Sequence, residues 1–81
     1  MVTVRFFAGA AQAAGVDSAR VPAAANQTLR EIAQTASSAD LTNILEVSSF
    51  LVDGALTDGD TPLGESADGR QVDVLPPFAG G

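Results

Sequence analysis

The chain has 81 residues, 46% of them hydrophobic, and a net charge of −6. This length suits one domain over residues 1–81, with enough apolar content for a core without disulfides or metals. The sequence has no Cys, no His and no Lys, so the thiol nucleophile, the usual general base and the Schiff-base amine are absent. We expect a protein that is no enzyme on its own and binds no metal.

The negative charge indicates which kinds of partner the protein can bind. An acidic chain is repelled by nucleic-acid backbones and anionic membranes, so we expect neither as a partner. The charge suits docking on a basic protein surface, and it also suits a simple role in solubility. No apolar run approaches the ~20 residues that span a bilayer, and residues 1–7 lack the pattern of a signal peptide. We therefore expect a cytoplasmic location.

The first part of the chain predicts two strands. Residues 2–7 are β-branched or aromatic and alternate at period two, which is typical of a strand. Residues 9–15 are small and suit a loop or a short helical turn. Residues 18–21 form the second predicted strand, a hairpin partner of the first.

The middle of the chain predicts helices. Thr28 and Glu31 have the spacing of a capping box, and apolar residues then recur at helical spacing, which predicts a helix over about 29–37. Residues 40–45 suit a second short helix with Asp40 as its N-cap.

The last part predicts three more strands. Residues 50–52 and 55–57 flank Asp53-Gly54, a strong signal for a two-residue hairpin turn. Residues 72–75 form the last strand. The order predicts an α+β domain with one main helix on a mixed sheet, and the apolar first and last strands are natural neighbours at its centre.

Strand alternation divides the predicted sheet into two faces. The helix is expected to cover the face with Val4, Phe6, Phe50, Val52, Val72 and Val74. The opposite face then carries Arg5, Phe7, Leu51, Asp73 and Leu75. On it, Phe7, Leu51 and Leu75 would form an exposed apolar patch, which usually marks a partner surface unless loops cover it.

Three acidic residues, Asp53, Asp58 and Asp60, lie close together in the sequence. Carboxylates in such a group can bind a divalent cation, but the spacing does not fit an EF-hand loop. Asp is common in turns because its side chain hydrogen bonds to nearby backbone. We interpret these residues as turn residues.

The C-terminal tail, residues 76–81, combines two unusual dipeptides. Pro76 and Pro77 lack N–H donors and favour an extended chain, so they end the last strand. Gly80 and Gly81 have no Cβ and can enter a narrow channel. Extended, residues 76–81 could reach ~20 Å. A Gly-Gly pair at a chain end is also typical of a frayed terminus.

Four segments together resemble a known family: residues 4–8 (VRFFA), 52–54 (VDG), 62–63 (PL) and 75–81 (LPPFAGG). They resemble the MoaD/ThiS sulfur-carrier family, most of all the small subunit of molybdopterin synthase. The resemblance covers the whole chain and implies a β-grasp (ubiquitin-like) fold with a flexible Gly-Gly tail.

The resemblance implies a carrier cycle. An E1-like adenylating enzyme would use ATP to adenylate the Gly81 carboxylate, and a sulfurtransferase would supply sulfur to form a thiocarboxylate. The carrier, with no permanently bound cofactor, would dock on the large subunit of molybdopterin synthase and give its sulfur to cyclic pyranopterin monophosphate. The implied reactive residues are Gly81 and Gly80, and the implied binding residues are Phe7, Leu51, Leu75, Pro76, Pro77, Phe78 and Ala79.

Two alternatives stay open. The same chemistry serves ThiS-like carriers for thiazole and carriers for cysteine synthesis. A Gly-Gly tail also serves ubiquitin-like modifiers, although a chain without Lys cannot form isopeptide-linked polymers on itself.

Overall fold

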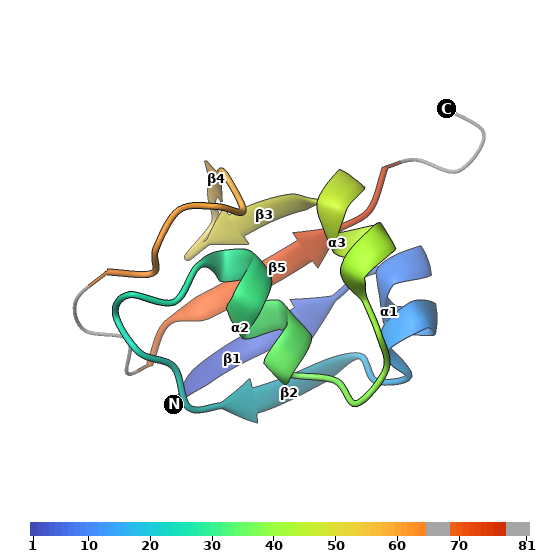
Figure 1. Cartoon of the computed structure of the whole chain (residues 1–81), viewed down its shortest axis with the longest axis horizontal. Coiled ribbons are helices and arrows are strands. Elements are labelled where there is room, and N and C mark those ends of the chain that lie inside the picture. Colours follow the sequence, from blue (N-terminus) through green and yellow to red (C-terminus); the bar gives the residue numbers. More distant parts are fainter. Residues whose placement is uncertain (65–68, 78–81) are drawn as a thin grey trace.

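The computed structural model describes residues 1–64 and 69–77. Its strands form one five-stranded sheet in the order β2-β1-β5-β3-β4. The elements in chain order are β1 (Val2–Phe6), α1 (Gly9–Ala14), β2 (Ser18–Val21), α2 (Leu29–Thr35), α3 (Thr42–Val47), β3 (Ser49–Val52), β4 (Ala55–Thr57) and β5 (Gln71–Leu75). The expected mixed sheet is confirmed, and Figure 1 shows α2 and α3 in front of it and α1 at one end.

The first and last strands are neighbours, as predicted. β1 pairs in parallel with β5, with Val4 opposite Val72, and β5 pairs antiparallel with β3. β5 is therefore the central strand, and β2 and β4 form the two edges. The residues after Leu75 therefore follow the central strand rather than an edge strand.

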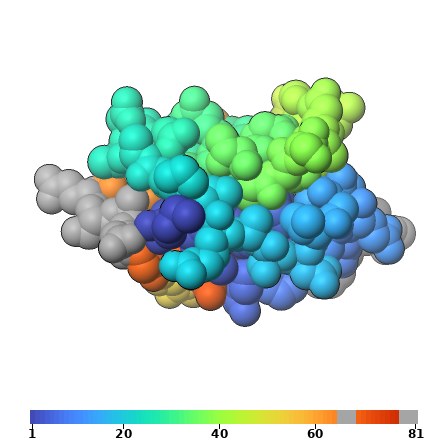
Figure 2. All heavy atoms as spheres, turned by 90° about the horizontal axis from the view of Figure 1, so that it is seen from below, coloured from blue at the N-terminus to red at the C-terminus, as the bar shows by residue number. Residues whose placement is uncertain are grey.

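The molecule has two layers, with α2 and α3 on one face of the sheet. Figure 2 shows the helical segments (green) above the strands. The core between the layers includes Val2, Val4, Phe6, Leu29, Ile32, Leu41, Leu45, Phe50, Val52, Val72 and Val74. All six sheet residues expected under the helix are buried. The face assignment from strand alternation therefore holds for the covered side.

The capping box at the start of α2 is present. Thr28 Oγ1 accepts a hydrogen bond from the Glu31 N–H at 3.1 Å, and Glu31 Oε1 accepts from the Thr28 N–H at 2.9 Å. These bonds satisfy two N–H groups that a helix start leaves without partners. The helix ends at Thr35 rather than near residue 37. Two residues further on, the Ser37 hydroxyl donates to the carbonyl of Ala14, the last residue of α1.

The expected N-cap at Asp40 is wrong. α3 begins at Thr42, its N-cap position is Leu41, and no side chain caps it. Leu41 is buried in the core and its N–H donates to Gln34 Oε1 at 2.8 Å, so tertiary packing sets where the helix starts. Asp40 instead accepts from the Thr42 hydroxyl at 2.6 Å and the Thr42 N–H at 3.0 Å, and these bonds lower the pKa of its carboxyl.

The hairpin between β3 and β4 has the predicted two-residue turn. Asp53 and Gly54 both have positive φ, 49° and 86°, as a type I′ turn requires. Asp53 Oδ1 also accepts from the Gln71 N–H, and Arg70 Nε donates to Asp53 Oδ2, both at 3.0 Å. The Gln71 bond, followed by the Arg70 bond, lowers the pKa of Asp53. The turn is thereby fixed to the start of β5.

Candidate functional site

The sheet face away from the helices, which we call the outer face, carries the predicted docking residues. The registers align Arg5 with Asp73 across β1 and β5, Asp73 with Leu51 across β5 and β3, and Leu51 with Leu56 across the hairpin. Residues opposite one another in a sheet share a face. One row of side chains therefore crosses the four strands β1, β5, β3 and β4.

The three predicted patch residues lie on this outer face with different exposures. Phe7 is 38% exposed, whereas Leu51 and Leu75 are half-buried. Phe7 follows β1 directly, and its N–H donates to the Val74 carbonyl at 3.1 Å, so it is held beside β5. Leu75 is opposite Ser49, at the end of β5. The patch is thus near the point where the chain leaves the sheet.

A fourth apolar residue, Leu56, extends the outer face to the sheet edge and was missed from the sequence. It is 76% exposed, the highest value among the large apolar residues of the described chain. A two-residue turn at 53–54 pairs residue 51 with residue 56, so the hairpin signal contained the information that Leu56 shares a face with Leu51. Such an exposed leucine adds to the apolar surface available to a partner.

An ion pair lies in the middle of this apolar surface. Arg5 Nε donates to Asp73 Oδ1 at 2.8 Å, and a second guanidinium nitrogen donates to Asp73 Oδ2 at 2.9 Å. Asp73 is only 4% exposed, whereas the Arg5 side chain is 44% exposed. The Arg5 guanidinium also lies 5.2 Å from the centre of the Phe7 ring. Alternation placed both residues on this face, but it did not predict their pairing or the burial of Asp73.

The tail begins at the end of this face. Pro76 is half-buried and Pro77 is exposed, directly after β5. The remaining predicted site residues, Phe78, Ala79, Gly80 and Gly81, lie outside the described residues. Their roles as binding or reactive groups stay predictions, as do those of Phe7, Leu51, Leu75 and the two prolines.

The acidic turn residues are held by protein groups. Asp58 accepts from the Asp60 N–H at 2.8 Å, and Asp60 forms an ion pair with Arg30. Asp53 makes the turn contacts described above. Within residues 1–64 and 69–77, no group of three or more acidic side chains could hold a metal ion. The turn interpretation agrees with these contacts.

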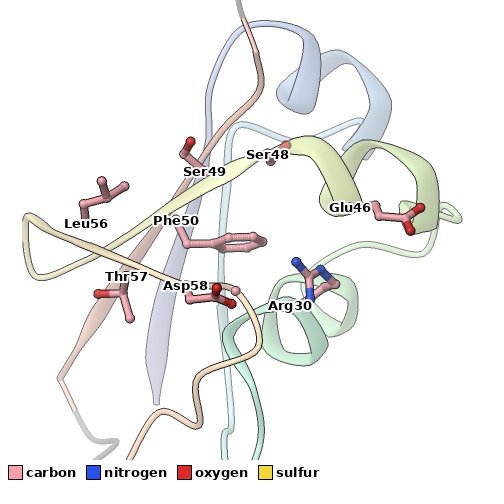
Figure 3. A pocket seen from close by; sticks show the side chains of 9 residues that line it. Arg30, Glu46, Ser48, Ser49, Phe50, Leu56, Thr57 and Asp58 are labelled. Atoms are coloured by element: carbon pink, nitrogen blue, oxygen red, sulfur yellow. The ribbon is translucent and has the colours of Figure 1, made fainter.

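A cleft of about 530 Å³ opens beside the hairpin on the helix side, lined by Arg30, Glu46, Phe50, Thr57 and Asp58 among others. Figure 3 shows Phe50 and Arg30 pointing toward one another there, with Leu56 pointing away from them. The Arg30 guanidinium lies 5.8 Å from the centre of the Phe50 ring and also donates to the Leu45 carbonyl. Arg30 is therefore engaged in structure, so the cleft is a weaker candidate than the outer face.

The described helices are all short. None in the part of the chain that the structure describes is long and apolar enough to cross a membrane.

The topology, with a helix packed on a mixed sheet whose first and last strands are parallel neighbours, is that of a β-grasp, or ubiquitin-like, domain. The ThiS family model matches residues 4–81, and the chain belongs to this family. It is thus a ThiS/MoaD-like sulfur carrier or ubiquitin-like modifier by family and fold. No curated protein matches the chain by sequence.

Solved structures agree with this fold. SAMP1 from Haloferax volcanii has a TM-score of 0.75 at 20% identity, over 99% of this chain and 98% of that one. A chain from the complex of subunits 1 and 2 of molybdopterin-converting factor from Helicobacter pylori has a TM-score of 0.62 at 29% identity, over 99% and 97% of the two chains. A putative molybdopterin-converting factor subunit 1 from Pyrococcus furiosus has a TM-score of 0.66 at 23% identity, over 95% and 97%.

Proposed function

We propose that this chain is the sulfur-carrying small subunit of a molybdopterin synthase in the cytoplasm. The observation that carries the proposal is the similarity to a chain of the Helicobacter pylori complex, which joins subunits 1 and 2 of molybdopterin-converting factor. The family match supports the carrier chemistry because it extends to Gly81. The paired prolines directly after the central strand support a tail that leaves the sheet.

The chemistry is proposed to occur on the Gly81 carboxyl group. A carboxylate is a poor acyl donor, so an E1-like enzyme first transfers AMP from ATP to it and releases pyrophosphate. A sulfurtransferase then supplies sulfur to the acyl carbon, and AMP leaves, which gives the thiocarboxylate. The thiocarboxylated carrier docks on the large synthase subunit, where its sulfur bonds to cyclic pyranopterin monophosphate. Water then cleaves the bond between the acyl carbon and the sulfur, which regenerates the Gly81 carboxylate. ATP is used by the activating enzyme and is no cofactor of this chain.

The outer face is the proposed docking surface for these partners. Phe7, Leu51, Leu56 and Leu75 offer apolar side chains on one face, and Pro76 continues from it toward the tail. A few residues in the desolvated centre of an interface carry most of the binding energy, and this centre is more apolar than the rest of the protein surface. A partner seated on this face would hold the start of the tail close to its own surface, so docking and delivery of the carboxyl group would be coupled.

The activation step is tested with the E1-like enzyme of the same organism. Deleting Gly81, or adding one residue after it, is expected to abolish transfer of AMP from labelled ATP while thermal unfolding stays unchanged. The wild-type chain is the matched control. Transfer of AMP to the truncated or extended chain would contradict the assignment of the reactive group.

The pathway is tested by mixing the thiocarboxylated chain with the large synthase subunit and cyclic pyranopterin monophosphate. Formation of molybdopterin is the expected result. Loss of the sulfur only to a thiazole or cysteine precursor would favour the other carrier pathways. Attachment to lysines of other proteins would favour a modifier, the role for which SAMP1 supplies similarity of fold.

A further inference from the structure

The Arg5–Asp73 ion pair lies within the apolar surface of the outer face. It lies on the two adjacent central strands, with the Phe7 ring beside the guanidinium and Leu51 opposite Asp73 in the register. A partner that covers the apolar side chains around the pair must also cover the pair itself. Polar groups enclosed in this way cost affinity unless they have hydrogen-bond partners.

Arg5 and Asp73 differ in how many of their hydrogen-bonding groups have a partner. Both carboxylate oxygens of Asp73 accept hydrogen bonds from Arg5, and Asp73 is almost fully buried before any partner binds. The guanidinium has five N–H groups, and the two bonds to Asp73 leave three. Among the described residues, Arg5 has no hydrogen-bond partner other than Asp73. Of the two residues, Arg5 is therefore the one whose donors need an acceptor when a partner covers the pair.

Arg5 also lines a hollow on the protein surface. Arg5 uses its β5 side for Asp73, and on its other side the register places Ser18 of β2. The hollow has a volume of about 390 Å³ and is lined by Arg5, Phe6, Phe7, Asp17 and Ser18, among others. It adjoins the apolar patch at Phe7, so a side chain or loop of a partner on the outer face can enter it.

The charges around the hollow indicate what kind of group fits. Arg5 is already neutralised by Asp73, Asp17 contributes a further carboxylate, and the chain as a whole carries −6. A second carboxylate beside Arg5 would meet net negative charge. A neutral acceptor, such as a main-chain carbonyl oxygen, would meet the free N–H groups without that repulsion.

We propose that the large synthase subunit, when it docks on the outer face, inserts a neutral hydrogen-bond acceptor into the hollow beside Arg5, so that the Arg5–Asp73 pair determines docking specificity. A partner with a purely apolar surface would enclose the guanidinium without an acceptor and bind weakly. This inference rests on the proposed function for the identity of the partner.

The test replaces the pair together, as Arg5→Leu with Asp73→Val. The double variant keeps the net charge, and exchanging a buried ion pair for apolar residues often leaves stability unchanged or raised. Thermal unfolding checks that the variant folds. Asn43→Leu is the control, because it also replaces an exposed polar side chain by leucine and keeps the net charge, and Asn43 is an exposed residue of α3 on the helix side of the sheet. Calorimetric titration with the purified large subunit gives the dissociation constants at low and high salt.

The expected result is binding about tenfold weaker or worse for the folded double variant, since the partner's acceptor is left without a donor. The Asn43→Leu chain is expected to bind within about twofold of wild type, and the loss in the double variant should be similar at both salt concentrations. A double variant that binds as tightly as wild type overturns the inference alone. A loss that disappears at high salt points to a partner carboxylate and overturns it as well. Failure of the wild-type chain to bind overturns the proposed function together with the inference.

Discussion

An aspartate at Val74 should unfold the domain, whereas an aspartate at the neighbouring Leu75 should leave it folded and weaken partner binding. Val74 is fully buried under the helices, whereas Leu75 is half-buried on the outer face. A domain of 81 residues has a free energy of unfolding of about 4–12 kcal/mol. Val74→Asp loses about 1.5–3 kcal/mol of apolar burial and adds several kcal/mol for a carboxylate in the core. We expect this variant to be largely unfolded at room temperature.

Leu75→Asp should instead spare the fold and damage binding. At its partly exposed position we expect a loss of about 1 kcal/mol or less, which for a domain of this size lowers the Tm by about 4–8 °C at most. At the centre of an interface the same change should cost about 2 kcal/mol of affinity or more, roughly 30-fold in Kd. Asp73, on the same face, adds little repulsion because Arg5 neutralises it.

Both variants are measured by thermal unfolding, and Leu75→Asp is also titrated against the large synthase subunit. The reasoning predicts that the Tm and the Kd separate for Leu75→Asp. A drop in Tm as severe as that of Val74→Asp would mean that Leu75 serves the core. Unchanged affinity in a folded Leu75→Asp chain would mean that the partner binds elsewhere.

Three further changes test the fold. Gly59→Ala should lower the free energy of unfolding, measured in urea, by about 1–3 kcal/mol, because the new Cβ would lie 2.6 Å from the Phe50 ring. Gly9→Ala is its control, because a Cβ at Gly9 would have nothing within 4 Å. Equal stability of the two variants would contradict the close packing at Gly59. Thr28→Ala should cost about 1 kcal/mol by removing the cap of α2, and an unchanged urea midpoint would deny the cap any net role. The lowered pKa of Asp53 contributes stability that is present near neutral pH and lost as the pH falls below about 4. Asp53→Asn should therefore lose less stability than wild type between neutral and acid pH, and an equally steep acid decline would refute the linkage.

Local signals predicted most elements of the fold. The alternation in β1 and β5, the capping box and the Asp53-Gly54 turn each depend on residues close in sequence, so short-range physical chemistry was sufficient for them. Asp40 shows where such signals fail: an acidic residue before a helix is a good N-cap in isolation, but burial of Leu41 moved the start of α3.

The site depends more on long-range pairing. Strand alternation predicted that Arg5 and Asp73 lie on the same face. Their contact, however, depends on the parallel register between β1 and β5, which lie at opposite ends of the chain. Asp73, which is only 4% exposed, lies in this register between Arg5 and Leu51. Sequence reasoning on single strands has no access to this register. The position of Leu56 on the outer face could have been predicted from the two-residue turn, because that turn pairs Leu56 with Leu51.

The central claim is that the Gly81 carboxyl group carries sulfur, and mass spectrometry of the protein isolated from its own host tests it most directly. The intact chain should show a subpopulation heavier by the exchange of one oxygen for one sulfur, and fragmentation should place the exchange at Gly81. Disruption of the gene for the E1-like enzyme should remove this population. A chain whose C-terminus is never thiocarboxylated, found instead in isopeptide linkage to lysines of other proteins, would contradict the carrier function.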